Sequence, residues 1–165
     1  MYVPIGIANC FELINEKYGH NILVRGRLSC CGQYSFHIKY LGDLKANIFG
    51  HYSIFHKHDD AVIMSAKCIK CGKIIRVFNS YTDGYDNCVD KSQPLISSKQ
   101  LNDFSCPACF ANCYSLEISY EYLSKEELEE DGIEQYENAF TWIWVSLRCV
   151  ICEKIFKNLI DMETA

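Results

Sequence analysis

The 165-residue sequence contains no long hydrophobic run. A membrane-spanning helix needs about eighteen or more consecutive apolar residues, and no stretch approaches that length. The first twenty residues lack a basic leader, and Glu12 and Glu16 interrupt their apolar character. We therefore expect neither a secretion signal nor a membrane partner. The predicted compartment is the cytoplasm, where thiols stay reduced.

Motifs of common enzymes are also missing. The sequence shows no phosphate-binding loop, no His-Glu-x-x-His and no Ser-His-Asp set. His51, His56 and His58, followed by Asp59 and Asp60, have side chains that bind divalent ions, but a solvated hairpin tip is the simpler interpretation of this stretch. We therefore expect a protein that is not an enzyme.

Cysteine is the residue that stands out, because the chain contains eleven. An odd number cannot all pair as disulfides, and three of the spacings are Cys-x-x-Cys, which suits a metal better. Cys10, Cys88 and Cys113 have no evident partner in the sequence, so we interpret them as small buried hydrophobic residues. The cysteine content therefore predicts metal binding through thiolates.

Two parts of the sequence nearly repeat each other. "YSFHIKY" (34–40) precedes "YSLEISY" (114–120) by 80 residues, and "SAKCIKCGKII" (65–75) precedes "SLRCVICEKIF" (146–156) by 81. A nearly constant offset favours duplicated units. In each unit the order is a cysteine cluster, a strand, a variable segment, a second strand, a Cys-x-x-Cys and a third strand. The predicted strands span residues 34–40, 61–67 and 73–78 in the first unit and 114–120, 139–148 and 154–160 in the second.

Each predicted unit contains four cysteines for one metal ion. A Cys-x-x-Cys turn directs two sulfurs at one ion, and two facing turns complete a tetrahedron with Zn–S distances of about 2.3 Å. In the first unit the opening pair is adjacent instead of spaced, so we expect one or two zinc ions per chain, with iron as the alternative. A rival pairing would join the closing pair of the first unit to the opening pair of the second. The predicted ligands are Cys106, Cys109, Cys149 and Cys152 in the second unit and Cys30, Cys31, Cys68 and Cys71 in the first.

This order of parts resembles the zinc-ribbon and rubredoxin-like superfamily. "KCIKCGKIIRVFNSYTDGYD" (67–86) is also similar to small uncharacterised bacterial proteins with tandem ribbons. The resemblance implies a mainly β fold of two three-stranded units. A short helix is expected in residues 9–19, and another, with a Ser/Glu capping box, in 124–132. The predicted divisions are an N-terminal helix and lead-in strand (1–28), a first unit (29–81), a linker (82–105) and a second unit (106–165).

Charge is unevenly distributed along the chain. Residues 21–80 carry nine Lys or Arg and three Asp, whereas residues 81–165 carry six Lys or Arg and sixteen Asp or Glu. The basic part would favour a phosphate backbone, and contact between the two parts in different copies would give self-association. The candidate contacts to nucleic acid are Arg25, Arg27, Lys67, Lys70, Lys73 and Arg76.

Four thiolates fill the coordination shell of a metal and leave no position for a substrate. The preferred interpretation is therefore a zinc-stabilised, non-catalytic interaction module with a protein partner. Two alternatives stay open at this point. One is nucleic-acid binding through the basic first unit, and the other is a rubredoxin-like iron or thiol redox protein.

Overall fold

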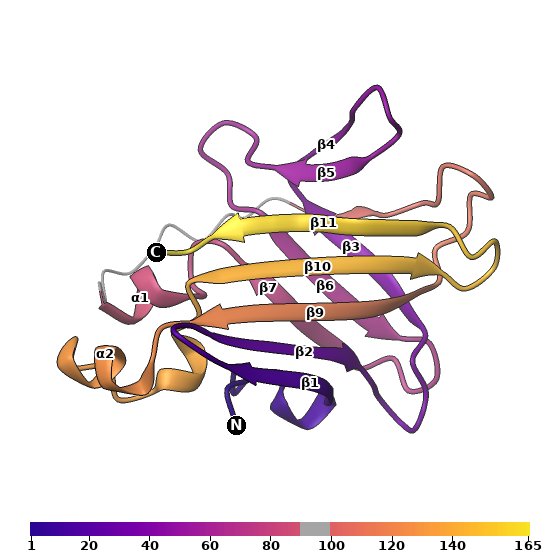
Figure 1. Cartoon of the computed structure of the whole chain (residues 1–165). Coiled ribbons are helices and arrows are strands. Elements are labelled where there is room, and N and C mark those ends of the chain that lie inside the picture. Colours follow the sequence, from indigo (N-terminus) through magenta and orange to yellow (C-terminus); the bar gives the residue numbers. More distant parts are fainter. Residues whose placement is uncertain (90–99) are drawn as a thin grey trace.

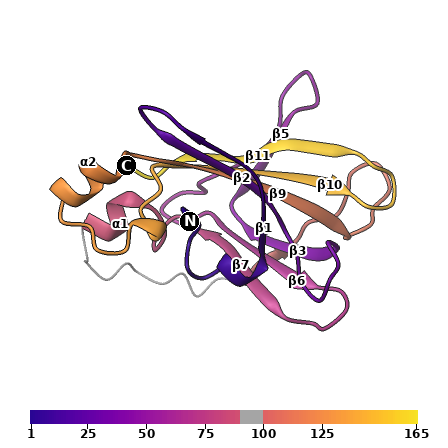
Figure 2. The same ribbon diagram turned by 60° about the horizontal axis from the view of Figure 1, so that its bottom comes forward.

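The computed structural model describes residues 1–89 and 100–165. Nine strands form one curled sheet whose two layers lie face to face (Figures 1 and 2). The front layer contains β1 (Phe11–Tyr18), β2 (Ile22–Leu28), β9 (Tyr114–Tyr122), β10 (Trp142–Cys149) and β11 (Ile155–Glu163). The back layer contains β3 (Phe36–Leu41), β6 (Ile63–Cys68), β7 (Ile74–Asn79) and the two-residue β8 (Asn102–Asp103).

Strand alternation explains which face of the front layer is buried. Along β9, buried and partly exposed residues alternate without exception, and β10 follows the same period. A period of two places every second side chain on the same face of a sheet. The inward side chains of β9 are Tyr114, Leu116, Ile118, Tyr120 and Tyr122, each no more than 2 % exposed.

The core between the layers is rich in aromatic rings. Phe104 packs edge-on against Phe156, with centroids 5.2 Å apart and planes at 90°. Phe78 of the back layer meets Phe140 at 6.3 Å, and Phe140 meets Tyr120 of the front layer at 4.9 Å. Each buried ring removes a large apolar area from water, so these contacts hold the two layers together.

The two layers join along one edge of β9. Residues 117–122 of β9 pair with β2, and Tyr114 pairs with Phe36 of β3. On its other edge, residues 114–121 of β9 pair with β10. Because β2 and β3 follow one another along the same edge, the sheet turns there from the front layer into the back layer (Figure 2).

This arrangement corrects the expected fold of two tandem three-stranded units. The six strands expected from the repeat are present, but they belong to one nine-stranded sheet that also includes β1, β2 and β8. Pairing of β2 with β9 joins residues about a hundred positions apart, as in Asn21 Nδ2 donating to Glu121 Oε1 at 2.6 Å. The expected division of the chain into segments that end at residues 28, 81 and 105 stays a prediction. Residues 90–99 of the expected linker lie outside the described residues.

The expected N-terminal helix in residues 9–19 is also wrong, since most of this segment forms the edge strand β1. Its apolar residues have a helix-like spacing, but Phe11 is 8 % exposed whereas Ile14 and Tyr18 are 50 % and 67 % exposed. An edge strand with a register shift between Leu13 and Asn15 does not show the alternation that identifies a strand in a sequence.

The remaining elements lie outside the main sheet. The helices α1 (Tyr85–Val89) and α2 (Lys125–Glu130) lie at one end of the molecule, near the C-terminus (Figure 1). Ser124 and Glu127 form the expected capping box of α2. A separate hairpin of β4 (Asp43–Ala46) and β5 (Tyr52–Phe55) projects from the body, and single 3-10 turns span Ala8–Cys10 and Tyr136–Asn138. Among the described residues, no helix has the length and apolar character needed to cross a bilayer.

Candidate metal centres

The fold brings eight cysteines into two groups of four. Within each group, the sulfur atoms lie within 4.8 Å of one another. The first cysteine group is Cys30, Cys31, Cys68 and Cys71, and the second cysteine group is Cys106, Cys109, Cys149 and Cys152. These are the sets expected within each repeat, so the rival pairing across the repeats is not formed. No disulfide joins any of these eight cysteines.

The sulfur separations match those of a four-coordinate metal site. Cys106 Sγ lies 3.6 Å from Cys152 Sγ, and Cys109 Sγ lies 3.6 Å from Cys149 Sγ. In the first cysteine group, Cys30 Sγ is 3.6 Å from that of Cys71. A regular tetrahedron with metal–sulfur bonds of about 2.3 Å has edges of about 3.8 Å. Both groups can therefore hold a metal ion of this size with little rearrangement.

Three Cys-x-x-Cys turns share one backbone geometry. In each turn the carbonyl of the first cysteine accepts a hydrogen bond from the residue four positions on, which is Gly72, Phe110 or Glu153, at 2.9, 2.7 and 2.9 Å. These three residues have φ angles of 74°, 63° and 62°. The first cysteine also donates its N–H to the carbonyl five positions on, in the pairs Cys68–Lys73, Cys106–Ala111 and Cys149–Lys154.

The opening pair of the first cysteine group uses a different turn. Cys30 and Gln33 exchange backbone hydrogen bonds of 3.0 and 3.1 Å, with Cys31 and Gly32 between them at φ angles of 55° and 71°. Two central residues with positive φ indicate a tight hairpin turn of the primed type. This geometry lets two adjacent cysteines reach one site, with their sulfurs 3.8 Å apart.

Backbone amides favour the thiolate form of one cysteine in each group. Burial alone would raise the pKa of Cys68, but N–H groups of Cys71 and Lys70 lower it to about 6. The side chain of Gln33 also donates to Cys68 Sγ, at 3.0 Å. Hydrogen bonds to the charged form of a group lower its pKa. The turn that positions the sulfur therefore also prepares it as a ligand.

Burial and backbone hydrogen bonds also have opposite effects on a thiol of the second cysteine group. Burial raises the pKa of Cys149, while the N–H groups of Cys152 and Ile151 outweigh burial and lower it to about 7. In the first cysteine group, by contrast, burial and the neighbouring thiols raise the pKa of Cys30 to about 12. Several thiolates side by side repel each other unless a cation lies between them. The donor chemistry of both groups thus fits a metal ion.

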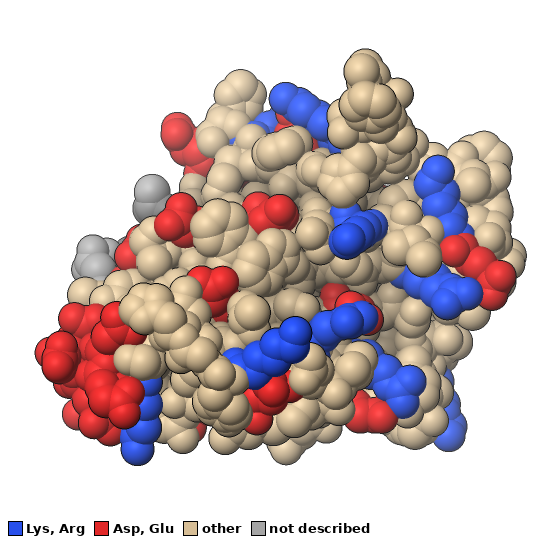
Figure 3. All heavy atoms as spheres, in the orientation of Figure 1, with Lys and Arg blue, Asp and Glu red and all other residues tan. Residues whose placement is uncertain are grey.

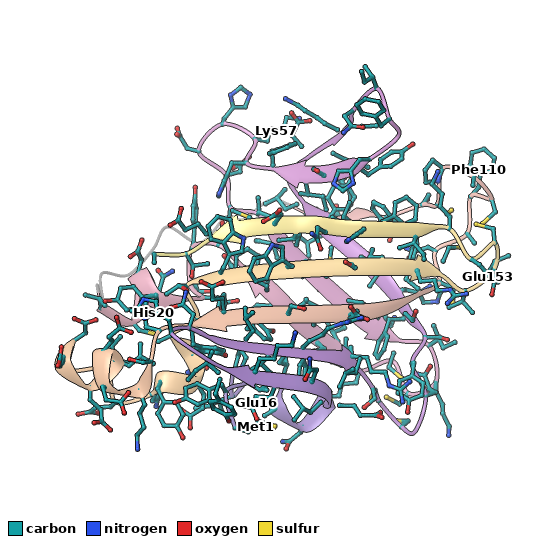
Figure 4. The ribbon with its side chains drawn as sticks, in the orientation of Figure 1. Met1, Glu16, His20, Lys57, Phe110 and Glu153 are labelled. Carbon is teal, nitrogen blue, oxygen red and sulfur yellow. The ribbon has the colours of Figure 1, made fainter. Side chains whose placement is uncertain are left out.

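The two groups differ in exposure. Cys106 and Cys149 are each 0 % exposed, and Cys109 is half-buried. In the first cysteine group only Cys68 is buried, and both Cys31 and Cys71 are exposed. Phe110 and Glu153, which end the turns of the second cysteine group, lie at the same end of the front layer (Figure 4).

The other cysteines and the histidines lie outside these groups. Cys10 is buried as expected, and Lys73 Nζ lies 3.6 Å from its sulfur, while Cys88 and Cys113 are only partly buried. Within residues 1–89 and 100–165, no histidine belongs to a group able to hold a metal. The ring of His56 instead meets the carbonyl oxygen of Asp60 at 3.0 Å.

The basic residues expected to contact nucleic acid are divided between the two layers. Arg25 and Arg27 lie on β2 of the front layer, whereas the other four lie on the β6–β7 hairpin of the back layer. The structure brings Arg25 and Arg27 together with three residues that the sequence interpretation did not select: Lys17, Arg148 and Lys157. The alternation of buried and exposed residues along each strand indicates that these basic side chains point outward. The sequence does not show that β2 pairs with β9, so it does not show that the five residues lie together.

Comparison of the chain with protein-family models, with curated proteins and with solved structures found no match.

Proposed function

We propose that the protein is a non-catalytic binding protein whose cysteine turns are stabilised by two structural zinc ions. The composition of the cysteine groups carries this proposal, because each group offers four sulfurs at tetrahedral spacing. Four cysteine ligands close the shell of zinc, whereas a catalytic zinc keeps one position for water or substrate. The ions would stabilise the hairpin turns and would not take part in a reaction.

Metal analysis of the purified protein tests this proposal. We expect two zinc atoms per chain and a colourless solution, because zinc has no d–d transitions. Ferric iron in four thiolates would colour the solution red, and that outcome would favour the redox alternative. A count of one or none would also contradict the proposal. Cys113→Ser serves as the control, because Cys113 belongs to neither group and its replacement should leave two zinc atoms in place.

As a second candidate function, we propose that the protein binds another protein. The β4–β5 hairpin is the observation that favours this. Ile48 and Phe49, at the tip of this projecting hairpin, are 94 % and 87 % exposed (Figure 1). Adjacent exposed apolar side chains on a projecting element are typical of contact sites between proteins.

The matched control for this second candidate is Phe110, which is 81 % exposed but lies in another loop. Affinity capture after nuclease treatment would compare Ile48→Ser/Phe49→Ser with Phe110→Ser. We expect the hairpin variant to lose a captured protein that the Phe110 variant retains. Identical capture by both variants would exclude the hairpin as the contact.

A further inference from the structure

A groove of about 1020 Å³ runs over the solvent face of the front layer. Residues of β2, β9, β10 and β11 form its floor and walls, and residues of β1 form its rim. The outward side chains that line it include Arg25, Ser119, Trp144, Ser146, Arg148 and Lys157. None of these residues belongs to a cysteine group, so the groove is separate from the candidate metal centres.

The sequence of β9 explains why this face is hollow. Two of its outward residues, Ser115 and Ser119, have short side chains, and Glu117 lies between them. In the sheet, Ser119 pairs with Arg25 of β2 on one side and with Trp144 of β10 on the other. Long side chains on both neighbouring strands therefore flank a floor of short ones, and the depression follows β9.

The groove concentrates positive charge in a protein whose net charge is −5. Five basic residues line it, and Glu117 is the one acidic residue among the lining residues. Figure 3 shows Lys and Arg across the middle and right of this face, with Asp and Glu gathered at the other end around α2. The basic lining residues are Lys17, Arg25, Arg27, Arg148 and Lys157.

Part of this charge is available to a ligand. Lys17 and Lys157 are exposed and form no ion pair with any described residue. Arg25 Nε contacts Glu117 Oε1 at 2.6 Å, but both side chains are solvent-accessible, at 54 % and 39 % exposed. Exposed ion pairs contribute little stability, so an anionic ligand can displace Glu117 from Arg25.

Aromatic faces lie beside the cations. Trp144 lines the groove and stacks on Trp142, with ring centroids 5.8 Å apart and an interplanar angle of 18°. At the other wall, the guanidinium of Arg27 lies 3.9 Å from the centre of the Tyr34 ring. Flat groups of this kind stack against nucleobases of any sequence.

We propose that this groove binds single-stranded nucleic acid along β9. The phosphates would contact Lys17, Arg25 and Lys157, and a base would stack at Trp144. Basic residues on both walls match a flexible polyanion, and the aromatic side chain favours one that carries bases. This inference does not rest on zinc binding and can fail or succeed independently of it.

The first test measures binding of a fluorescein-labelled single strand of about fifteen nucleotides by anisotropy at low salt. Lys17→Glu/Lys157→Glu should weaken binding by at least about tenfold and reduce its dependence on salt. Lys39→Glu/Lys67→Glu reverses two exposed charges on β3 and β6 of the back layer and should leave the affinity within about twofold. Glu117→Gln removes the carboxylate that pairs with Arg25 and should strengthen binding. If the back-layer variant alone weakened binding, the proposal would be wrong.

The second test uses the two tryptophans, which are the only ones in the chain. Trp142→Phe leaves Trp144 as the reporter in the groove, and a bound strand should quench its fluorescence. Trp144→Leu leaves Trp142 beyond the groove lining, and we expect little quenching and an affinity at least about fivefold lower, because leucine has no ring on which a base can stack.

Competing ligands separate nucleic acid from other anionic partners. Polyglutamate carries charge but no bases, so it should compete poorly and should not quench Trp144. Equal competition by polyglutamate would overturn the proposal in favour of an acidic protein segment. Self-association at low salt that Lys17→Glu/Lys157→Glu abolishes, without binding of the labelled strand, would identify the acidic end of a second copy as the occupant and would also overturn it.

Discussion

Phe36 of β3 pairs with Tyr114 of β9, and this pair joins the back layer to the front layer. Phe36 also pairs with Cys68, and Tyr114 also pairs with Cys149. The four residues form one continuous row across β6, β3, β9 and β10, and each is no more than 1 % exposed. The two cysteine groups therefore begin at opposite ends of this row, which crosses three strand spacings of about 4.8 Å each along the curved sheet.

Cys149→Ser should therefore destabilise the protein severely. Cys149 belongs to the second cysteine group, ends β10 and is 0 % exposed. Structural zinc contributes on the order of 10–16 kcal/mol of apparent binding free energy in small domains, and loss of a ligand forfeits much of it. We expect one zinc atom per chain to be lost and the melting temperature to fall by about 10 °C or more. Cys113→Ser is the matched control, and melting at the same temperature in both variants, with full metal content, would contradict the assignment.

The first cysteine group should release its metal before the second. Two of its members, Cys31 and Cys71, are exposed and only Cys68 is buried, whereas the second cysteine group has one exposed member, Cys152, and two fully buried ones. A chelator added to the folded, zinc-loaded protein should remove the ions in two phases, which a colorimetric chelator would record. In Cys31→Ser the fast phase should disappear and the slow one persist. Loss of the slow phase in that variant would show that the first cysteine group releases its metal second.

Much of the cysteine chemistry could be predicted from the sequence. The Cys-x-x-Cys spacing and the nearly constant offset of the repeat favour the pairing of cysteines that is found, because both are properties of short segments. The geometry of the Cys30–Cys31 pair could not be predicted in the same way. Adjacent cysteines reach one site here because Cys31 and Gly32 both take positive φ angles, and such a turn depends on the strands that it connects.

Phe110→Gly should stabilise the protein by about 0.5–1 kcal/mol. Phe110 has a φ angle of 63° and a side chain that is 81 % exposed, so it carries conformational strain and contributes little burial. The equivalent position in the first cysteine group is Gly72, where Gly72→Ala should destabilise by about 1 kcal/mol. Chemical denaturation of the metal-loaded protein would measure both. Changes of the same sign would show that the backbone angle does not control stability in these turns.

The side chain of Asn112 substitutes for a strand at the edge of β3. Its Oδ1 accepts from the N–H of Ile38 at 2.8 Å, and its Nδ2 donates to the carbonyl of Ile38 at 3.1 Å. Asn112→Asp keeps the shape but replaces the donor with an acceptor, which faces a carbonyl oxygen. We expect a loss of about 1–3 kcal/mol in denaturant unfolding. Asn15→Asp, on the exposed edge strand β1, should change stability by less than about 0.5 kcal/mol, and equal effects would contradict this role.

The large sheet could not be predicted from the sequence, although its six repeat strands could. Each of these strands has a local pattern, such as the strict alternation of β9, but its neighbours are chosen by packing between distant segments. Phe11, Ile14 and Tyr18 illustrate the limit of local patterns. Their spacing fits a helix face, yet the strand that they form is selected by pairing with β2.

The separation of charge on the front face, with α2 acidic and the groove basic, gives the molecule an electric dipole. In the field of a polyanion, this dipole would experience a torque that turns the α2 end outward before any contact is made. Encounter would thus begin with the correct side facing the ligand, despite an unfavourable total charge. Added salt would weaken that alignment, since fields decay within about 8 Å at physiological ionic strength.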